Sequence, residues 1–335
     1  MIQATPEQTQ GINALAFVFP GQGSQEPGML KDLFSQFSSV RDVFEQASDI
    51  LGWNVWDLAH LGTAEEMADT RKTQPLMLVA DIAVWSAWCQ HTQQRPTWVA
   101  GHSLGEYAAL VASHAITFSD ALRAVEVRAN AMHDVSVHQP GGMLAVLGLT
   151  FEHVAAVCTQ IQDSNVLNGD SGIWPANING HKQIVVGGDI QSLEKATPLF
   201  ISAGALKVVN VKMSVPSHCP LMQPVAQKLK PVLESISIKT PQINIIANLT
   251  GKPVKTADEI RHALTEQITQ PVQWVQTIET LQANAITQCA ECGPGKVLQG
   301  LGRRIEKNIT HFGLDSSIFL QEGIELVQHN VVSTC

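Results

Sequence analysis

The sequence has no hydrophobic run long enough to cross a lipid bilayer and no excess of positive charge. A membrane-spanning helix needs about 20 consecutive apolar residues, and no stretch of this chain approaches that length. The chain has 21 Lys and Arg against 30 Asp and Glu, which gives a formal net charge of -9. Because nucleic-acid binding depends on clustered positive side chains, we expect neither a membrane nor a nucleic acid as a partner.

Cysteine is also scarce, with six residues in a chain of 335. The first residues lack the basic and then apolar pattern of a secretory signal, so we expect a cytoplasmic protein with reduced thiols and a loose polar extension over residues 1–12. Cys289 and Cys292 form a C-x-x-C pair, but a structural zinc site requires a second pair of ligands. We therefore expect no metal, and we interpret this pair as part of a strand that enters a glycine turn.

The composition that is present is typical of a globular enzyme, with 44% hydrophobic and 15% charged residues. The length suggests two domains, or one large domain with an insertion. In the first 138 residues, short apolar runs alternate with helical patterns, which predicts an α/β fold with a mostly parallel sheet. The predicted strands are Ala14–Phe19 and Thr97–Ala100, and the predicted helices are Met29–Phe37, Val40–Leu51, Thr73–Gln90, Leu104–His114 and Ser119–Val135.

The pattern changes after Pro140, where the predicted order of elements becomes β-α-β-β-α-β. This order is the ferredoxin-like unit. Its predicted strands are Met143–Leu149, Trp174–Ile178, Gln183–Val186 and Leu206–Val211, and its predicted helices are Phe151–Gln162 and Gln191–Ala203. We therefore expect a small domain of residues 139–211, inserted into an α/β core that comprises residues 1–138 and 212–335.

A candidate nucleophile lies between a predicted strand and a predicted helix. The segment GHSLG, at residues 101–105, matches the pattern G-x-S-x-G. In this context the glycines permit a sharp turn, which presents the serine hydroxyl at the N-terminus of the helix. We therefore expect Ser103 to attack a carbonyl carbon.

A serine hydroxyl is a weak nucleophile at neutral pH and needs a base at hydrogen-bonding distance. The chain has 12 histidines, and His102 is a poor candidate because its place on the turn directs it elsewhere. His218 stands out because it lies in SVPSHCP, a polar segment between two prolines where the chain returns from the small domain. The residues alone leave the other histidines open.

A candidate charged pocket involves Arg128, which lies on the apolar stripe of the predicted helix at 119–135, whereas Arg123 lies on the polar stripe. A buried guanidinium requires a partner, since an isolated charge is unstable away from water. From the residues alone, an internal carboxylate is as good a partner as a negatively charged substrate.

Five motifs occur in the order that one enzyme family has. They are FPGQGSQ at 19–25, GHSLGEY at 101–107, VPSHC at 215–219, PVQW at 271–274 and GPGKVL at 293–298. With these motifs, the chain resembles the bacterial malonyl-CoA:acyl-carrier-protein transacylases over about residues 14–310. The resemblance implies a hydrolase-like core with a ferredoxin-like insertion, in agreement with the boundaries expected above.

The resemblance also implies roles for single residues. It implies Ser103 as the nucleophile, His218 as its base, and the backbone N–H groups of Gln22 and Leu104 as the oxyanion hole. From the residues alone, the loop that contains Gln22 is simply a glycine turn. The PVQW motif implies that the backbone carbonyl of Gln273 orients His218, which makes the site a dyad instead of a triad with an acid.

In the family an arginine binds the free carboxylate of the substrate. The segment VEVRANAM matches the segment of that arginine, which implies the role for Arg128, although Ala129 replaces the usual glycine. Asn177 and Asn179 match polar positions that border the family's cleft, while a turn-capping role fits them equally well. Met132 is a further candidate for the lining of this cleft.

The expected activity is transfer of the malonyl group from malonyl-CoA to the phosphopantetheine thiol of an acyl carrier protein, for fatty acid biosynthesis and without a bound cofactor. Acidic carriers require a local basic patch. Lys296, Arg303, Arg304 and Lys307 form the densest basic cluster, although a solvated basic helix end fits them at least as well. Three alternatives stay open: a serine thioesterase or esterase, an acyltransferase of a polyketide pathway, and a docking module without activity.

Overall fold

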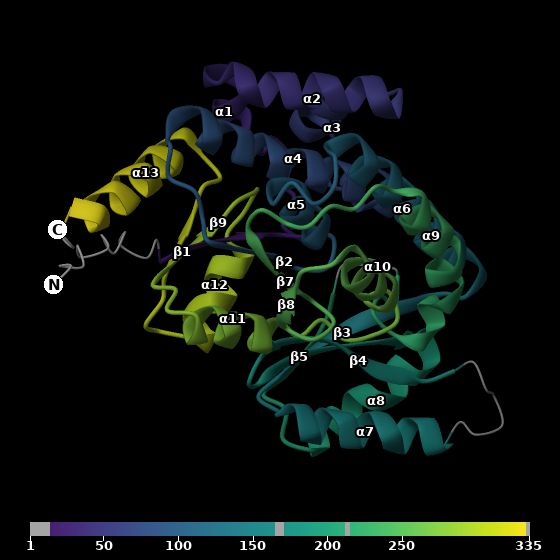
Figure 1. Cartoon of the computed structure of the whole chain (residues 1–335). Helices are drawn as coiled ribbons and strands as arrows, with labels where there is room; N and C mark the ends of the chain where they lie inside the picture. Colours follow the sequence, from purple (N-terminus) through teal and green to yellow (C-terminus); the bar gives the residue numbers. More distant parts are fainter. Residues whose placement is uncertain (1–13, 165–170, 212–214, 333–335) are drawn as a thin grey trace, which may run out of the picture.

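The computed structural model describes residues 14–164, 171–211 and 215–332, which form two β-sheets and the helices that cover them (Figure 1). The expected extension at residues 1–12 lies outside the described residues. Among the residues that are described, no helix is both long and apolar enough to span a membrane.

The larger sheet has six strands in the order β10-β9-β1-β2-β7-β8. Neighbouring strands are parallel except at the edge, where β8 runs antiparallel to β7. The mostly parallel sheet predicted from the sequence is therefore confirmed. The strands are β1 (Leu15–Phe19), β2 (Trp98–Gly101), β7 (Asn244–Ala247), β8 (Lys252–Val254), β9 (Gln288–Glu291) and β10 (Thr310–Gly313).

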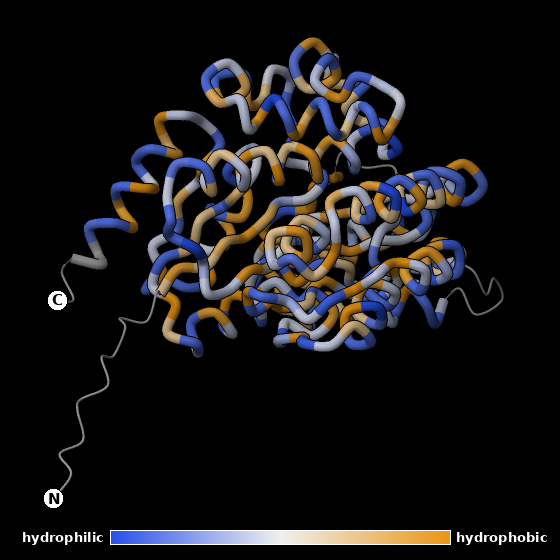
Figure 2. The backbone as a smooth tube through the Cα atoms, turned by 45° about the horizontal axis from the view of Figure 1, so that its top comes forward, coloured by the Kyte–Doolittle hydropathy of each residue, from blue (hydrophilic) through white to orange (hydrophobic). Residues whose placement is uncertain are grey.

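Helices pack on both faces of this sheet, and the outer ones alternate between hydrophobic and hydrophilic residues along the chain (Figure 2). This alternation gives each helix an apolar side toward the core. The helices are α1 (Lys31–Gln36), α2 (Ser38–Leu51), α3 (Val55–Leu61), α4 (Thr70–His91), α5 (Gly105–Ala112), α6 (Phe118–His138), α9 (Gln223–Ser235), α10 (Ala257–Glu266), α11 (Trp274–Ala283), α12 (Val297–Ile305) and α13 (Ser317–Val332).

Strand β1 separates two hydrophobic cores, because successive side chains of a strand point to opposite faces of its sheet. Leu15, Phe17 and Phe19 belong to the larger core, which also contains α4. Ala16 and Val18 belong to a second core, to which α11 and α12 contribute. The sheet is therefore the middle layer of three.

Helix α4 crosses the larger core, and most of its residues are buried. The indole rings of Trp85 and Trp88 meet the ring of Phe17 edge to face, with centroids 5.5 and 5.0 Å apart. Edge-to-face pairs of this kind stabilise a core beyond the burial of their area. They fix α4 against β1 and so place the N-terminal half of α4 beside the end of that strand.

The smaller sheet has antiparallel strands in the order β4-β5-β3-β6. Helices α7 (Phe151–Ser164) and α8 (Ile190–Ser202) cover its outer face (Figure 1). The predicted ferredoxin-like unit is confirmed, since its elements follow one another in the order β3-α7-β4-β5-α8-β6. Its expected limits at residues 139 and 211 stay a prediction. The strands are β3 (Gly141–Leu147), β4 (Ile173–Gly180), β5 (Gln183–Asp189) and β6 (Lys207–Asn210).

The smaller sheet is joined to the core along its edge strand β4. Asn177 forms a parallel bridge with Val272, which belongs to the segment before α11. The backbone N–H of Ile178 donates to the carbonyl of Val272, and the N–H of Val272 donates to the carbonyl of Ala176, both at 2.9 Å. These bonds fix the position of β4 relative to the core.

Each predicted strand and helix up to residue 211 has a counterpart in the structure, with different ends. Helix α4 begins at Thr70 instead of Thr73, because the side chain of Asp69 caps it by accepting a hydrogen bond from the N–H of Arg71. Helix α3 has no predicted counterpart. After residue 215, only the strand at Cys289 is predicted, and it corresponds to β9.

Candidate active site

The loops that follow β1, β2, β7 and β9 lie together at the carboxyl ends of these strands, because the four strands are parallel. One face of the smaller sheet lies opposite these loops, and a cleft of about 250 Å³ separates the two. The cleft is lined by these residues of the predicted site: Gln22, Ser103, Leu104, Arg128, Met132, Asn177, Asn179 and His218.

Ser103 lies in the sharp turn between β2 and α5. Its φ is 54°, a left-handed conformation that residues other than glycine rarely adopt. The turn is so compact that a Cβ atom on Gly101 would lie 1.9 Å from the carbonyl carbon of Gly105. Oδ1 of Asn248, the residue after β7, accepts a hydrogen bond from the N–H of Ser103 at 2.7 Å. This bond stabilises the turn in its strained conformation.

His218 contacts the nucleophile directly. Its Nε2 lies 2.7 Å from Ser103 Oγ, and its Nδ1 lies 2.7 Å from the carbonyl oxygen of Gln267. A carbonyl oxygen only accepts hydrogen bonds, so Nδ1 carries the proton and Nε2 accepts from the serine hydroxyl. Burial, and then the positive charge of Arg128, lower the pKa of His218 to about 3. The imidazole is therefore neutral near pH 7 and able to accept a proton.

The prediction that the carbonyl of Gln273 orients His218 is wrong. This carbonyl accepts hydrogen bonds from the N–H and the hydroxyl of Thr277, at 3.0 and 2.9 Å, because Gln273 immediately precedes α11. The acceptor for His218 is instead the carbonyl of Gln267, the residue after the last turn of α10. Carbonyls at the end of a helix lack an intrahelical donor and carry partial negative charge, which favours a bond from the imidazole N–H.

Arg128 is buried beside the nucleophile, with 2% of its surface exposed. Its Nη1 donates to Oε1 of Gln74, and its Nη2 donates to Ser103 Oγ at 3.1 Å. Its Nε has no hydrogen-bond partner, and no carboxylate oxygen lies within 4.0 Å of the guanidinium, among the residues described. Within that part of the chain, no carboxylate forms a direct ion pair with Arg128, and the charge of the buried Glu106 acts on the guanidinium only from a greater distance.

A chain of hydrogen bonds connects Arg128 with the loop after β1. Nε2 of Gln74 donates to Oγ1 of Thr70 at 2.7 Å, and this hydroxyl donates to Oε1 of Gln22 at 3.1 Å. The backbone N–H groups of Gln22 and Leu104 donate to no other residue within the described ranges. Both residues line the cleft, so their N–H groups are available to a ligand.

The cleft-lining candidates from the smaller sheet, Asn177 and Asn179, lie inside β4, so a turn-capping role does not apply to them. Oδ1 of Asn179 lies 2.8 Å from Nε2 of His102. This contact directs the ring of His102 toward the smaller sheet and away from Ser103, in agreement with its rejection as the base. The sulfur of Met132 accepts a hydrogen bond from Gln74 at 3.3 Å.

The four basic residues of the expected docking patch lie on or beside α12 but have different partners. Lys296 lies 3.7 Å from the centre of an aromatic ring of α13, and Arg303 donates to a backbone carbonyl of β10 at 2.8 Å. Arg304 donates to the side chain of Gln183 at 3.4 Å, and Lys307 is exposed. Since Gln183 lines the cleft, Arg304 is the member of the cluster that contacts its border.

Both cysteines of the C-x-x-C pair are buried, Cys289 inside β9 and Cys292 directly after it, and both thiols are free. Burial raises the pKa of Cys289 and of Cys292, which disfavours the reactive thiolate form. No group of three or more His, Cys, Asp or Glu that could hold a metal ion occurs in the part of the chain that the structure describes.

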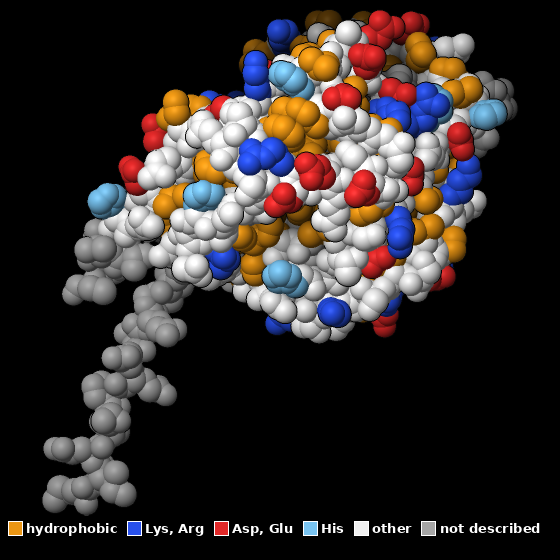
Figure 3. All heavy atoms as spheres, turned by 90° about the horizontal axis from the view of Figure 1, so that it is seen from above, with side chains coloured by type: hydrophobic (Ala, Val, Ile, Leu, Met, Phe, Trp, Pro, Cys, Tyr) orange, Lys and Arg blue, Asp and Glu red, His pale blue; other side chains and the backbone are white. Residues whose placement is uncertain are grey.

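On the face seen in Figure 3, acidic and basic side chains are interspersed.

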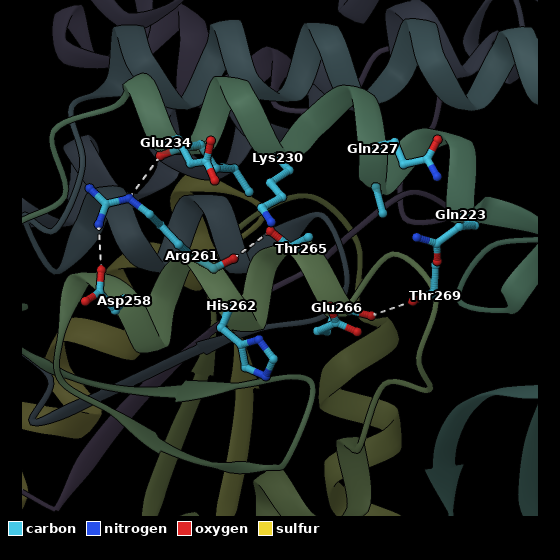
Figure 4. A pocket seen from close by; sticks show the side chains of 12 residues that line it. Gln223, Gln227, Lys230, Glu234, Asp258, Arg261, His262, Thr265, Glu266 and Thr269 are labelled. Atoms are coloured by element: carbon cyan, nitrogen blue, oxygen red, sulfur yellow. Dashed lines mark hydrogen bonds and ion pairs between the residues drawn. The ribbon is translucent and has the colours of Figure 1, made fainter.

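A larger cavity, of about 760 Å³, lies in the groove between α9 and α10 (Figure 4). It contains neither Ser103 nor His218, and its guanidinium, Arg261, is already paired with Asp258 at 3.1 Å. Cavity size therefore does not identify the site here. The chemistry points to the smaller cleft, where a neutral base, a hydroxyl and an unpaired cation meet.

Four residues that organise the site were not among the predictions: Gln74, Glu106, Asn248 and Gln267. Glu106 belongs to the GHSLGEY motif, and a carboxylate in an otherwise apolar helix is a signal that sequence reading can use. Asn248 follows the apolar run of β7, at the end of a buried strand. Gln267 has no comparable signal, because its backbone and not its side chain contacts His218.

Comparisons with known sequences and with solved structures point to the same enzyme family. Residues 16–307 match the family described as acyl transferase domain. The malonyl CoA-acyl carrier protein transacylase of Haemophilus influenzae is 41% identical over 88% of this chain and 93% of its own length. FabD from Acinetobacter baumannii has a similar structure, with a TM-score of 0.90, 38% identity and coverage of 95% of this chain and 99% of that one.

A further similar structure contains a type II PKS acyl-carrier protein in complex with its malonyl-transacylase. Its TM-score is 0.89 and its identity 38%, over 93% of this chain and 99% of that one. The predicted resemblance to malonyl-CoA:acyl-carrier-protein transacylases is therefore confirmed. Because the family match includes the nucleophile turn, the histidine and the buried arginine that meet in one cleft, the chain belongs to the acyl transferase domain family.

Proposed function

We propose that this chain transfers the malonyl group from malonyl-CoA to the phosphopantetheine thiol of an acyl carrier protein. Ser103 is the nucleophile, His218 its base, and Arg128 the partner of the malonyl carboxylate. The observation that carries the proposal is the buried guanidinium, which has no carboxylate within 4.0 Å in the described residues and lies 3.1 Å from Ser103 Oγ. A buried charge of this kind fits an anionic substrate.

The first half of the reaction forms an ester on the serine. Nε2 of His218 takes the proton from Ser103 Oγ while the oxygen attacks the thioester carbon of malonyl-CoA. The N–H groups of Gln22 and Leu104 stabilise the oxyanion of the tetrahedral intermediate, where each donor is worth on the order of 3 kcal/mol. The carbon–sulfur bond then breaks, and coenzyme A leaves as a thiol with the proton from His218.

The second half runs in reverse on a different thiol. His218 removes the proton from the phosphopantetheine thiol, the sulfur attacks the malonyl ester, and Ser103 regains its proton as the carrier leaves with the malonyl group. These steps use only side chains and backbone groups of the chain. The carbonyl of Gln267 keeps the proton on Nδ1 throughout and stabilises the imidazolium through the negative end of α10.

We call Arg128 in this role the carboxylate clamp. The cleft around Ser103 is lined by the groups proposed for the reaction and by the side chains from the rest of the predicted site: Gln22, Leu104, Arg128, Met132, Asn177 and Asn179. We place the reaction in the cytoplasm, as the supply of malonyl units for fatty acid biosynthesis. The free thiols of the described cysteines support a reducing compartment. A thioesterase or esterase for uncharged acyl groups, the main rival, would not need a buried cation beside its nucleophile.

Intact mass spectrometry tests the proposal. The native protein mixed with malonyl-CoA should gain the mass of one malonyl group, and the Ser103→Ala variant should gain none. Addition of a carrier protein with its phosphopantetheine arm should then remove the adduct and acylate the carrier. Release of free malonate without acylation of the carrier would support the thioesterase instead. Carriers from fatty acid and from polyketide synthesis, compared by kcat/KM, identify the pathway.

A further inference from the structure

Glu106 is a buried carboxyl group that the proposed reaction does not use. It lies in the first turn of α5 and is 2% exposed. No Lys or Arg nitrogen lies within 4.0 Å of its carboxylate in the part of the chain described. A buried carboxylate without an ion pair is unfavourable, so hydrogen bonds must stabilise it.

These hydrogen bonds come from the two residues that hold the dyad. Oε2 of Glu106 accepts from Nε2 of Gln267 at 2.5 Å and from the backbone N–H of Asn248 at 3.3 Å. Gln267 binds His218 through its carbonyl, and Asn248 binds the N–H of Ser103 through its side chain. The supports of the base and of the nucleophile therefore meet at one carboxylate oxygen.

The side-chain amide of Gln267 has a defined orientation. Its Nε2 donates to the carbonyl of Ser103 at 3.1 Å as well as to Glu106. If the amide were rotated by half a turn, its oxygen would face two other acceptors, which is unfavourable. Glu106 and the nucleophile turn together hold this side chain, and with it the position of the backbone carbonyl that binds His218.

Backbone strain at both members of the dyad makes such support necessary. Ser103 has a φ of 54° and His218 a φ of 60°. Left-handed conformations in residues other than glycine persist only where surrounding contacts impose them, and they concentrate at functional sites. The contacts from Asn248 and Gln267 act on these two residues, and Glu106 accepts a hydrogen bond from each of them.

The charge of Glu106 is set by several groups around it. Burial raises its pKa to about 7, while hydrogen bonds from Gln267 and Asn248, and the charge of Arg128, lower it. Tyr107 is a further titratable group within reach of its charge. The donors favour the ionised form, in which the carboxylate is the stronger acceptor.

We propose that Glu106 is a positioning residue, whose carboxylate anchors Gln267 and Asn248 and thereby fixes His218 and Ser103 relative to each other. This inference rests on the roles proposed above for Ser103 and His218. Glu106 touches none of the reacting atoms. Its effect is therefore expected on the rate of acyl-enzyme formation and not on the KM for malonyl-CoA.

A double-mutant cycle between the acceptor and its donor tests the proposal. Glu106→Met removes the acceptor, and Gln267→Met removes the donor but keeps the backbone carbonyl. Each variant should lower kcat for coenzyme A release about 10-fold or more, equal to about 1.4 kcal/mol, with an unchanged KM. The double variant should lose less than the product of the two single losses, because both substitutions remove the contact between Glu106 and Gln267. Glu106→Gln, which keeps an acceptor oxygen, should restore part of the rate.

A spectroscopic measurement separates positioning from a general loss of structure. The proton on Nδ1 of His218 should give a downfield resonance that shifts in Glu106→Met and Gln267→Met and moves back in Glu106→Gln. A matched control is Glu266→Gln, since Glu266 precedes Gln267 but lines the groove between α9 and α10 (Figure 4). This control should keep the native kcat and the native resonance.

The outcomes are distinguishable. Native kcat in both Met variants, or losses that multiply in the double variant, would overturn the positioning role. If Glu106→Met does not fold, native rates and resonances in both Glu106→Gln and Gln267→Met overturn it instead. An active Ser103→Ala variant would overturn the dyad itself, whereas an inactive Ser103→Ala beside a fully active Glu106→Met would overturn only the inference about Glu106.

Discussion

The guanidinium of Arg128 donates a hydrogen bond to Ser103 Oγ at 3.1 Å, so the proposed clamp and the proposed nucleophile touch each other. This short distance matches the malonyl group, in which one methylene separates the thioester carbon from the carboxylate. When the thioester carbon lies at Ser103 Oγ, the carboxylate lies within reach of the guanidinium. A longer acyl group, such as succinyl, would carry its carboxylate past this position.

The first prediction is that Arg128→Ala inverts the preference between malonyl-CoA and acetyl-CoA. The kcat/KM for malonyl-CoA should fall by a factor that corresponds to several kcal/mol, as when one partner of a buried ion pair is removed. Acetyl transfer should hold or improve, because an uncharged acyl group leaves the native guanidinium without its partner. The measurement is kcat/KM for both thioesters, beside a melting curve. Arg123→Ala, on the exposed side of the same helix, is the control.

A parallel loss with both thioesters and a lowered melting temperature would count against the clamp. That result would mean that Arg128 only stabilises the fold. Succinyl-CoA adds a second comparison, since the native protein should form its ester more slowly than the malonyl ester if the spacing between clamp and nucleophile selects the chain length.

The second prediction concerns the base. His218→Ala should slow acyl-enzyme formation by at least about 10²-fold, because general-base help is typically worth 10²–10⁴ in rate. The measurement is the burst of coenzyme A release, with His262→Ala, an exposed residue in the groove of α10, as the control. A near-normal burst in His218→Ala would assign the base to another group.

The third prediction concerns carrier docking. Among the basic residues of α12, Arg304 contacts Gln183 at the border of the cleft, whereas Arg303 is bound to a backbone carbonyl. Arg304→Glu should therefore raise the KM for the carrier protein more than Arg303→Glu does, without a change in acyl-enzyme formation from malonyl-CoA. Lys252→Glu, on the edge strand β8, is the control. An unchanged carrier KM in Arg304→Glu at low salt would refute this patch.

The fourth prediction follows from Asp81 in the buried helix α4. Neither of its carboxyl oxygens has a hydrogen-bond partner among the described residues, and burial, followed by the charge of Glu291, raises its pKa well above the usual value. Its stabilising contribution is complete only below the unfolded pKa of about 4. As the pH rises toward the folded pKa, the unfolded chain releases this proton more readily, and the free energy of unfolding falls.

The side chain at position 81 cannot ionise in the Asp81→Asn variant. The melting temperature of this variant should therefore rise relative to that of the native protein as the pH increases from about 5 to about 8. The difference between the two melting temperatures is the measurement, because Glu291, with a pKa raised to about 7, contributes a similar slope in both proteins. The exposed Asp49→Asn should show no such trend. A difference that stays constant across this pH range would show that Asp81 has an ordinary pKa.

The sequence is sufficient to predict most of the architecture up to residue 211, because period and turn signals there are strong. The apolar run Leu15–Phe19, which Pro20 and Gly21 close, predicts a buried strand, and the glycines around Ser103 predict a sharp turn. The region after residue 215 is less legible, since helix α9 contains two prolines, Pro224 and Pro231, and β7 has only four residues.

Some residues of the site can be predicted from the sequence, whereas others are recognised only in the folded structure. The turn pattern G-x-S-x-G points to Ser103, and the match to the family's motifs selects His218 and Arg128. The acceptor for His218 is a backbone carbonyl, and every residue has one, so only the fold can select Gln267 over Gln273. The role of Glu106 is hidden for a related reason: its partners lie more than a hundred residues away along the chain.

The bridge between β4 and Val272 has a consequence for chimeric enzymes. The segment that pairs with β4 continues into Gln273, whose N–H donates to the carbonyl of Asn248 at 2.9 Å, and Asn248 in turn holds Ser103. A small domain grafted from a homologue would therefore bring a foreign edge strand against a segment two contacts away from the nucleophile. Grafts that exchange residues 271–273 together with the small domain should retain turnover better than grafts that exchange the small domain alone.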